Sequence, residues 1–77
     1  MRTIITVTHN NYLPGQYTIS DSGRDKRGRS YQATTARGPA AAAAVAMERA
    51  IQINGGYVVF GPDDVLALIP ADMRERK

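Results

Sequence analysis

The alanine-rich segment 36–56 constrains the fold more than any other part of this chain. Residues 40–46 include six alanines, and alanine has the highest helix propensity of all residues. Pro39 suits the first helical turn, and the glycines at 55 and 56 predict where the helix stops. Because alanine side chains are short, such a helix can approach a sheet closely. The helical spacing predicts one apolar face, formed by Ala43, Ala44, Met47, Ala50, Ile51 and Asn54, with Met47, Ile51 and Ile53 as its bulky anchors.

Three strands are predicted before this helix. Residues 3–8 are β-branched throughout and place Ile5 and Val7 on one face. Residues 16–20 and 29–35 alternate in the same way around a segment rich in Gly, Asp and Lys, which is typical of a hairpin. The three strands therefore predict an antiparallel meander.

Two apolar runs follow the helix within residues 56–70. They are separated by Gly61-Pro62-Asp63-Asp64, whose composition is typical of a turn. This pattern predicts a second hairpin, and the charged tail 71–77 is expected to fray or to form one helical turn. The predicted fold is α+β: an antiparallel sheet of about five strands in the order βββαββ, with one Ala-rich helix packed on one face, in a single domain over 1–77.

The chain length and composition limit the classes of function. A chain of 77 residues buries only about 60% of its unfolded surface, so a binding module is favoured over an enzyme with a deep pocket. The absence of cysteine excludes disulfides and thiolate sites. No apolar run approaches the roughly 20 residues of a membrane span, and no signal peptide is recognisable. These features fit a reducing cytoplasm, and no membrane partner is expected.

The acid and imidazole side chains offer no recognisable catalytic arrangement. His9 follows a strand beside two asparagines, which predicts an exposed turn residue rather than a base or metal ligand. Asp63 and Asp64 are interpreted first as turn residues and second as contacts for a basic partner surface. No catalytic residue, metal site or cofactor is expected.

The sequence GRDKRGR at 23–29 contains four of the ten basic residues, namely Arg24, Lys26, Arg27 and Arg29. Tyr17 and Tyr31 could stack on bases beside such a cluster, but their alternation with Ile19 and Ala33 favours the core. The helix also opens without charge until Glu48, unlike the lysine-bearing last helix of double-stranded-RNA-binding domains. Two interpretations stay open: the turn of a hairpin, or a contact surface for an acidic protein or for nucleic acid.

Three segments together carry a resemblance to a known family: TIITVTHNNYLPGQY (3–17), GPAAAAAVAM (38–47) and YVVFGPDDVLALIPADMR (57–74). With these segments in this order, the chain resembles a family of small phage anti-CRISPR proteins, the fifth family described against the type I-F system of Pseudomonas. The resemblance spans almost the whole chain and rests on collinearity and spacing rather than on a catalytic motif.

The resemblance implies an inhibitor that works by binding in the cytoplasm of the host bacterium. Its expected partner is a subunit of a type I RNA-guided surveillance complex, with the large subunit favoured, and nucleic acid of that complex could lie nearby. The implied mechanism is steric exclusion of the nuclease-helicase. The alternatives are a small basic nucleic-acid-binding phage protein or an antitoxin-like regulator. The apolar segment 57–69 also leaves a face that a second copy of the chain could cover.

Overall fold

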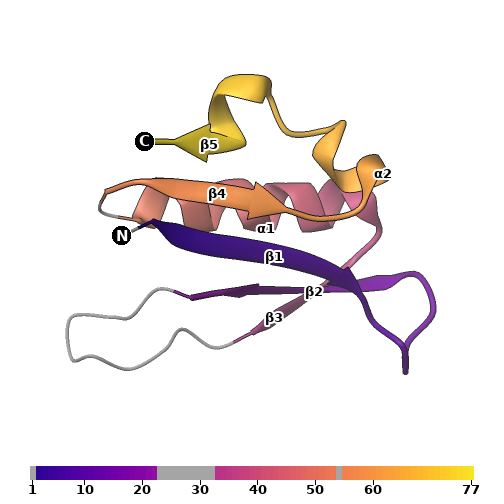
Figure 1. Cartoon of the computed structure of the whole chain (residues 1–77). Coiled ribbons are helices and arrows are strands. Elements are labelled where there is room, and N and C mark those ends of the chain that lie inside the picture. Colours follow the sequence, from indigo (N-terminus) through magenta and orange to yellow (C-terminus); the bar gives the residue numbers. More distant parts are fainter. Residues whose placement is uncertain (1, 23–32, 54) are drawn as a thin grey trace.

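The computed structural model describes residues 2–22, 33–53 and 55–77. Its fold is α+β, with a five-stranded sheet and one long helix against one face of that sheet (Figure 1). In chain order the elements are β1 (Thr3–His9), β2 (Gln16–Asp21), β3 (Thr34–Arg37), α1 (Pro39–Gln52), β4 (Tyr57–Phe60), α2 (Asp63–Leu66), the 3-10 turn η1 (Ala71–Met73) and β5 (Glu75–Arg76).

The sheet is mixed, so the prediction of a purely antiparallel sheet is wrong. Its strand order is β3-β2-β1-β4-β5. β1, β2 and β3 form the predicted antiparallel meander, and β1 pairs in parallel with β4. The physical reason is the path of α1. The helix carries the chain from the end of β3 back along the sheet, so that β4 pairs with the free side of β1 and runs parallel to both β1 and β3. A parallel neighbour needs such a crossover connection.

The predicted second hairpin is also wrong, because the apolar run after β4 forms the short helix α2 instead of a strand. Val65 and Ile69 are both buried, at 0% and 1% exposure, whereas Ala67, which a strand would place on the same face as these two residues, is exposed. Asp63 and Asp64 lie in the first turn of α2, where negative charge is favoured by the helix dipole.

The fifth strand comes from the tail. Residues 71–73 form a helical turn, which was one of the two expectations for the tail, and β5 then pairs antiparallel with β4, Tyr57 opposite Arg76 and Val58 opposite Glu75. The number of strands agrees with the prediction, but the identity of the last strand does not.

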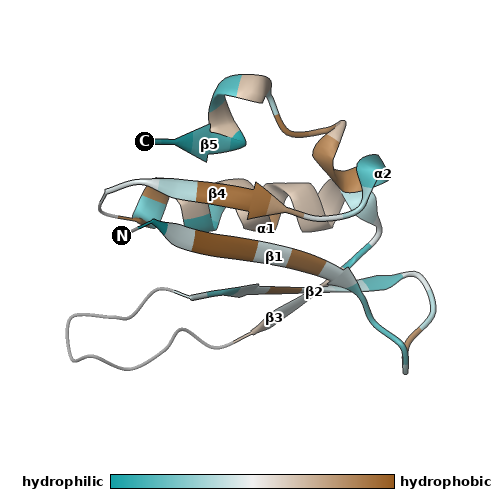
Figure 2. Cartoon of the chain, in the orientation of Figure 1, coloured by the Kyte–Doolittle hydropathy of each residue, from teal (hydrophilic) through white to brown (hydrophobic). Residues whose placement is uncertain are grey.

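The core lies between the sheet and α1. The helix contributes only alanines to the fully buried layer: Ala42, Ala43, Ala46 and Ala50. The sheet supplies the larger groups, and Figure 2 accordingly shows strongly hydrophobic colour along β1 and β4 and a paler tone on α1. The predicted apolar face of the helix is therefore rotated: Ala44 is exposed, and Ile51, expected as an anchor, is 72% exposed.

Both ends of α1 have identifiable backbone causes. The helix begins at Pro39, as predicted, after Gly38, whose φ of 84° favours glycine. It ends at Gln52, before the predicted glycine stop, because Ile53 is already extended. β3 continues to Arg37, beyond the predicted limit of 35, and residues 29–32 of that predicted strand lie outside the described residues.

Within the residues that the structure places, no helix is long and apolar enough to cross a membrane.

Candidate functional site

The predicted partner-binding residues fall into two groups. Arg24, Lys26, Arg27 and Arg29 lie outside the described residues. Asp63 and Asp64 are exposed at the start of α2. A hydrogen bond from Tyr17 to Asp64 places α2 beside the first residues of β2, whereas the segment 23–29 follows its last residue. The structure therefore does not bring the two aspartates near the end of β2 that leads into the basic segment.

The loop that joins β1 and β2 lies at the same end of the molecule as α2 (Figure 1). Asn10 organises this loop: its Oδ1 accepts hydrogen bonds from the backbone N–H groups of Tyr12 (2.9 Å) and Leu13 (3.2 Å). This is the Asx turn that favours asparagine at turn starts. Because one side-chain oxygen holds two consecutive backbone groups, the backbone at the tip has a defined conformation.

Backbone hydrogen bonds close the loop on both sides. The Gln16 N–H donates to the Leu13 carbonyl at 3.1 Å, and the Asn10 N–H donates to the Gln16 carbonyl at 2.9 Å. Gly15, with a φ of 80°, accepts from the Gly38 N–H at 2.9 Å, which ties the loop to the start of α1. The loop is therefore part of the folded scaffold.

This loop presents two large apolar side chains to solvent. Tyr12 is 92% exposed and Leu13 is 48% exposed. Aromatic side chains are enriched among the residues that dominate interface energetics. A loop with a fixed backbone also loses little conformational entropy when it binds. We call Tyr12 and Leu13 the loop tip; their arrangement suits insertion into an apolar pocket of a partner.

A chain of side-chain contacts connects the base of this loop to α2. The rings of His9 and Tyr17 lie 4.8 Å apart with a tilt of 38°. The Tyr17 hydroxyl donates a 2.5 Å hydrogen bond to Asp64 Oδ2. His9 is exposed, as the sequence predicts, but it is the last residue of β1 and not a turn residue. Tyr17 is in the core, as its alternation indicated.

The environment of Tyr17 raises its pKa above the usual value of 10.0, chiefly because the hydroxyl donates to Asp64, with burial and the negative charge of that carboxylate adding to the effect. A tyrosine with a raised pKa stays protonated at neutral pH and serves as a donor. The contact therefore fixes α2 against the sheet rather than activating a nucleophile.

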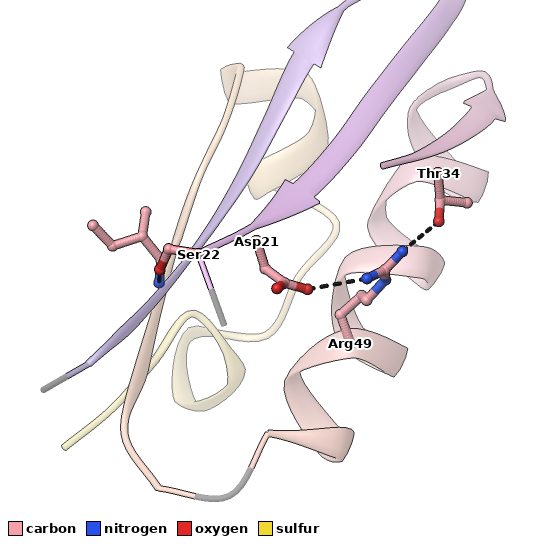
Figure 3. A network of polar contacts seen from close by, with 5 residues as sticks. Asp21, Ser22, Thr34 and Arg49 are labelled. Carbon is pink, nitrogen blue, oxygen red and sulfur yellow. Dashed lines mark hydrogen bonds and ion pairs between the residues drawn. The ribbon is translucent and has the colours of Figure 1, made fainter. Parts of the chain in front are cut away.

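A second polar network lies at the opposite end of β2 (Figure 3). Arg49 of α1 forms a 3.0 Å ion pair with Asp21 of β2 and donates a 2.5 Å hydrogen bond to Thr34 Oγ1 of β3. The Asp21 side chain is 1% exposed and that of Arg49 is 15% exposed. Nearby, the Ser22 hydroxyl accepts from the Ile4 N–H at 2.8 Å. This network fastens the helix to two strands.

Arginines near the C-terminus also have structural partners. Arg76 donates to the carbonyl of Ile53 at 2.6 Å and to that of Gly55, and its guanidinium lies 5.0 Å from the centre of the Tyr57 ring. Arg74 donates to the Ile69 carbonyl at 2.9 Å. These arginines hold the C-terminal segment on the sheet, so part of the basic composition serves the fold.

The loop tip was not identified as a site from the sequence. The available signal was HNNYLPG, in which an aromatic and an aliphatic residue lie inside an otherwise polar turn. Among the residues with described positions, no group of three His, Cys, Asp or Glu side chains is arranged to hold a metal ion.

No protein-family model matches the chain, and no curated protein matches it. The resemblance to an anti-CRISPR family therefore stays a prediction.

Proposed function

We propose that this chain is an anti-CRISPR inhibitor that binds a type I, specifically I-F, RNA-guided surveillance complex. The observation that carries a binding role is the preorganised loop with its exposed Tyr12 and Leu13. The collinear resemblance over segments 3–17, 38–47 and 57–74 supports the choice of partner.

The proposed mechanism is steric exclusion at the large subunit of that complex. The loop tip inserts into an apolar pocket, and the exposed Asp63 on the neighbouring α2 contacts basic groups beside it. A contact of roughly 800 Å² per partner is usual for a specific complex and is within reach of a molecule that measures 33 × 27 × 15 Å. The covered patch is then closed to the nuclease-helicase, so DNA cleavage stops without any reaction on the inhibitor.

The basic residues Arg24, Lys26, Arg27 and Arg29 enter this proposal as contacts to an acidic protein surface or to nucleic acid within the complex. The alternative, a free-standing nucleic-acid-binding protein, receives less support because Arg49, Arg74 and Arg76 are used within the fold. A salt titration separates the two, since affinity that rests on phosphate contacts falls steeply with salt.

The direct test is co-purification of the chain with purified type I-F surveillance complex, with and without bound target DNA. The proposal predicts a stable complex and loss of nuclease-helicase recruitment in the same reaction. Absence of association with either form, together with unimpaired CRISPR interference in cells that express the chain, contradicts it. Binding to isolated duplex or single strands alone would instead support the nucleic-acid alternative.

A further inference from the structure

The sheet has a second face, opposite α1, that no described helix or strand covers (Figure 1). In β1 the alternation is clear: Ile5 and Val7 point toward α1 and are 0% and 2% exposed, whereas Ile4 is 42% exposed. The even-numbered residues of β1 therefore lie on the uncovered side. We call this side the open face.

Apolar side chains form a continuous strip on the open face. Strand pairing places Ile4 beside Val58 and Thr6 beside Phe60. Phe60 is 55% exposed, and Val58 is half-buried. Ile4, Val58 and Phe60 thus make one patch across the neighbouring strands β1 and β4, which we call the apolar strip. Contiguous exposed apolar surface marks interaction sites more often than singly exposed residues do.

Uncharged hydroxyl groups border the strip on the side of β2 and β3, and the Arg2–Glu75 ion pair borders it on the side of β5. The strand register continues the open face from Thr6 to Ser20 and from Thr8 through Thr18 to Thr35. Charged side chains among the described residues of this face lie at its margins, where Arg2 pairs with Glu75 and Arg37 ends the edge strand. A centre without charge is typical of the core of a protein–protein contact and lacks the basic groups that hold a nucleic-acid backbone.

The broad side of the molecule is large enough for a dimer contact. The molecule measures 33 × 27 Å in its two longer directions and 15 Å in the third, so the sheet spans the broad side of a thin, two-layer domain. The footprint of that broad side is an upper limit for a contact through the open face, and it is of the order of the roughly 800 Å² per partner that a standard interface buries. A two-fold dimer needs a surface that fits itself, and the two apolar strips would meet at the centre of such a contact without bringing like charges together there.

We propose that two copies of this chain associate face to face through the open faces, with the two apolar strips in contact across a two-fold axis. Sheets stacked in this way lie about 10 Å apart, with their side chains interdigitated. The loop tip lies beyond the ends of the paired strands, so the dimer would present two copies of it. The proposal concerns the chain alone and does not depend on the proposed function.

The test is the molar mass of the purified full chain over a wide concentration range, measured by sedimentation equilibrium. The proposal predicts a rise from 8.4 kDa toward twice that mass. Phe60→Asp is expected to weaken the association at least about tenfold. The matched control is Ile51→Asp, which places the same charge at a 72% exposed apolar position on α1 and should leave the association unchanged. Circular dichroism confirms that both variants fold.

Nuclear magnetic resonance locates the contact independently. The side-chain signals of Ile4, Val58 and Phe60 should shift with protein concentration, and those of Ile51 should not. A wild-type chain that stays at the monomer mass at every concentration overturns the proposal. So does a dimer that Ile51→Asp disrupts and Phe60→Asp does not, because the contact would then lie on the helix side.

Discussion

Tyr17 connects parts of the chain that lie far apart in sequence. Its ring packs against His9 and its hydroxyl donates to Asp64, 47 positions away. Because the hydrogen bond exists only when the hydroxyl is protonated, the raised pKa and the attachment of α2 have one cause.

The stability of the fold should therefore fall at alkaline pH because of Tyr17. The pKa of Tyr17 is higher in the folded state than its unfolded value near 10.0. The side chain therefore contributes to the free energy of unfolding below the unfolded pKa, and this contribution is lost as the pH rises through the folded pKa. Tyr17→Phe removes this contribution, so the free energies of unfolding of variant and wild type should converge above about pH 10. Denaturant titrations at several pH values measure the difference. The exposed Tyr12→Phe serves as control, and identical pH profiles for wild type and Tyr17→Phe would refute the assignment.

Arg49 carries a second prediction at this scale. Arg49→Met keeps much of the side-chain volume but removes the ion pair to the nearly inaccessible Asp21 carboxylate. Loss of one partner of a buried pair is expected to lower the free energy of unfolding by about 2–4 kcal/mol. Urea denaturation measures the change. Arg37→Met, at an exposed position of β3, should alter it by less than about 0.5 kcal/mol. Equal effects of the two substitutions would mean that the network does not stabilise the fold.

At the scale of elements, the alanines of α1 determine how closely the helix lies on the sheet. Ala46 is completely buried, whereas Ala44, two positions earlier, is exposed. Ala46→Leu should therefore overpack the layer and destabilise the fold by about 1–3 kcal/mol. Ala44→Leu, which makes the same change on the outer face, should stay within about 0.5 kcal/mol of wild type. Thermal or urea unfolding of both variants checks this, and a tolerated Ala46→Leu would show that the helix can move away from the sheet.

Local patterns predicted most of the elements correctly. The β-branched and alternating runs at 3–8 and 16–20, the strand at 57–60 and the helix start at Pro39 agree with the structure. The run after Pro62 was assigned to a strand, because a short apolar run does not separate strand from helix by periodicity alone. The fifth strand could not be predicted, since Glu75 and Arg76 carry no strand pattern and pair only because β4 offers a free edge.

At the level of the whole molecule, the order and direction of the strands could not be predicted from local sequence patterns. The parallel pairing of β1 with β4 follows from the path of α1 across the sheet, not from either strand sequence. The same holds for the site: the exposure of Tyr12 depends on how Asn10 folds the loop, and the Tyr17–Asp64 contact joins residues that only the tertiary structure brings together. The prediction that Asp63 and Asp64 contact a partner rests on their residue type alone.

The basic segment allows a whole-molecule prediction about charge. Changing Arg24, Lys26 and Arg27 together to glutamate should leave the fold intact, because the described core forms from other residues. Inhibition of CRISPR interference should weaken if these side chains contact an acidic surface or nucleic acid in the complex. Circular dichroism tests the first expectation and a phage-plating assay the second. If the charge-reversed chain inhibits as well as wild type, the segment 23–29 has no role in binding.

The central claim is that this chain acts by binding through the loop tip. The most direct measurement is the affinity of purified chain for the type I-F surveillance complex, compared between wild type and Tyr12→Ala. Tyr12 is 92% exposed and is held in the loop by its backbone N–H, so removal of its side chain should not affect stability. Ile51→Ala on the outer face of α1 provides the matched control. We expect the Kd to increase at least about tenfold for Tyr12→Ala, as for an interface anchor, and to stay unchanged for Ile51→Ala. Equal affinities for wild type and Tyr12→Ala, or no binding by any of the three, would contradict it.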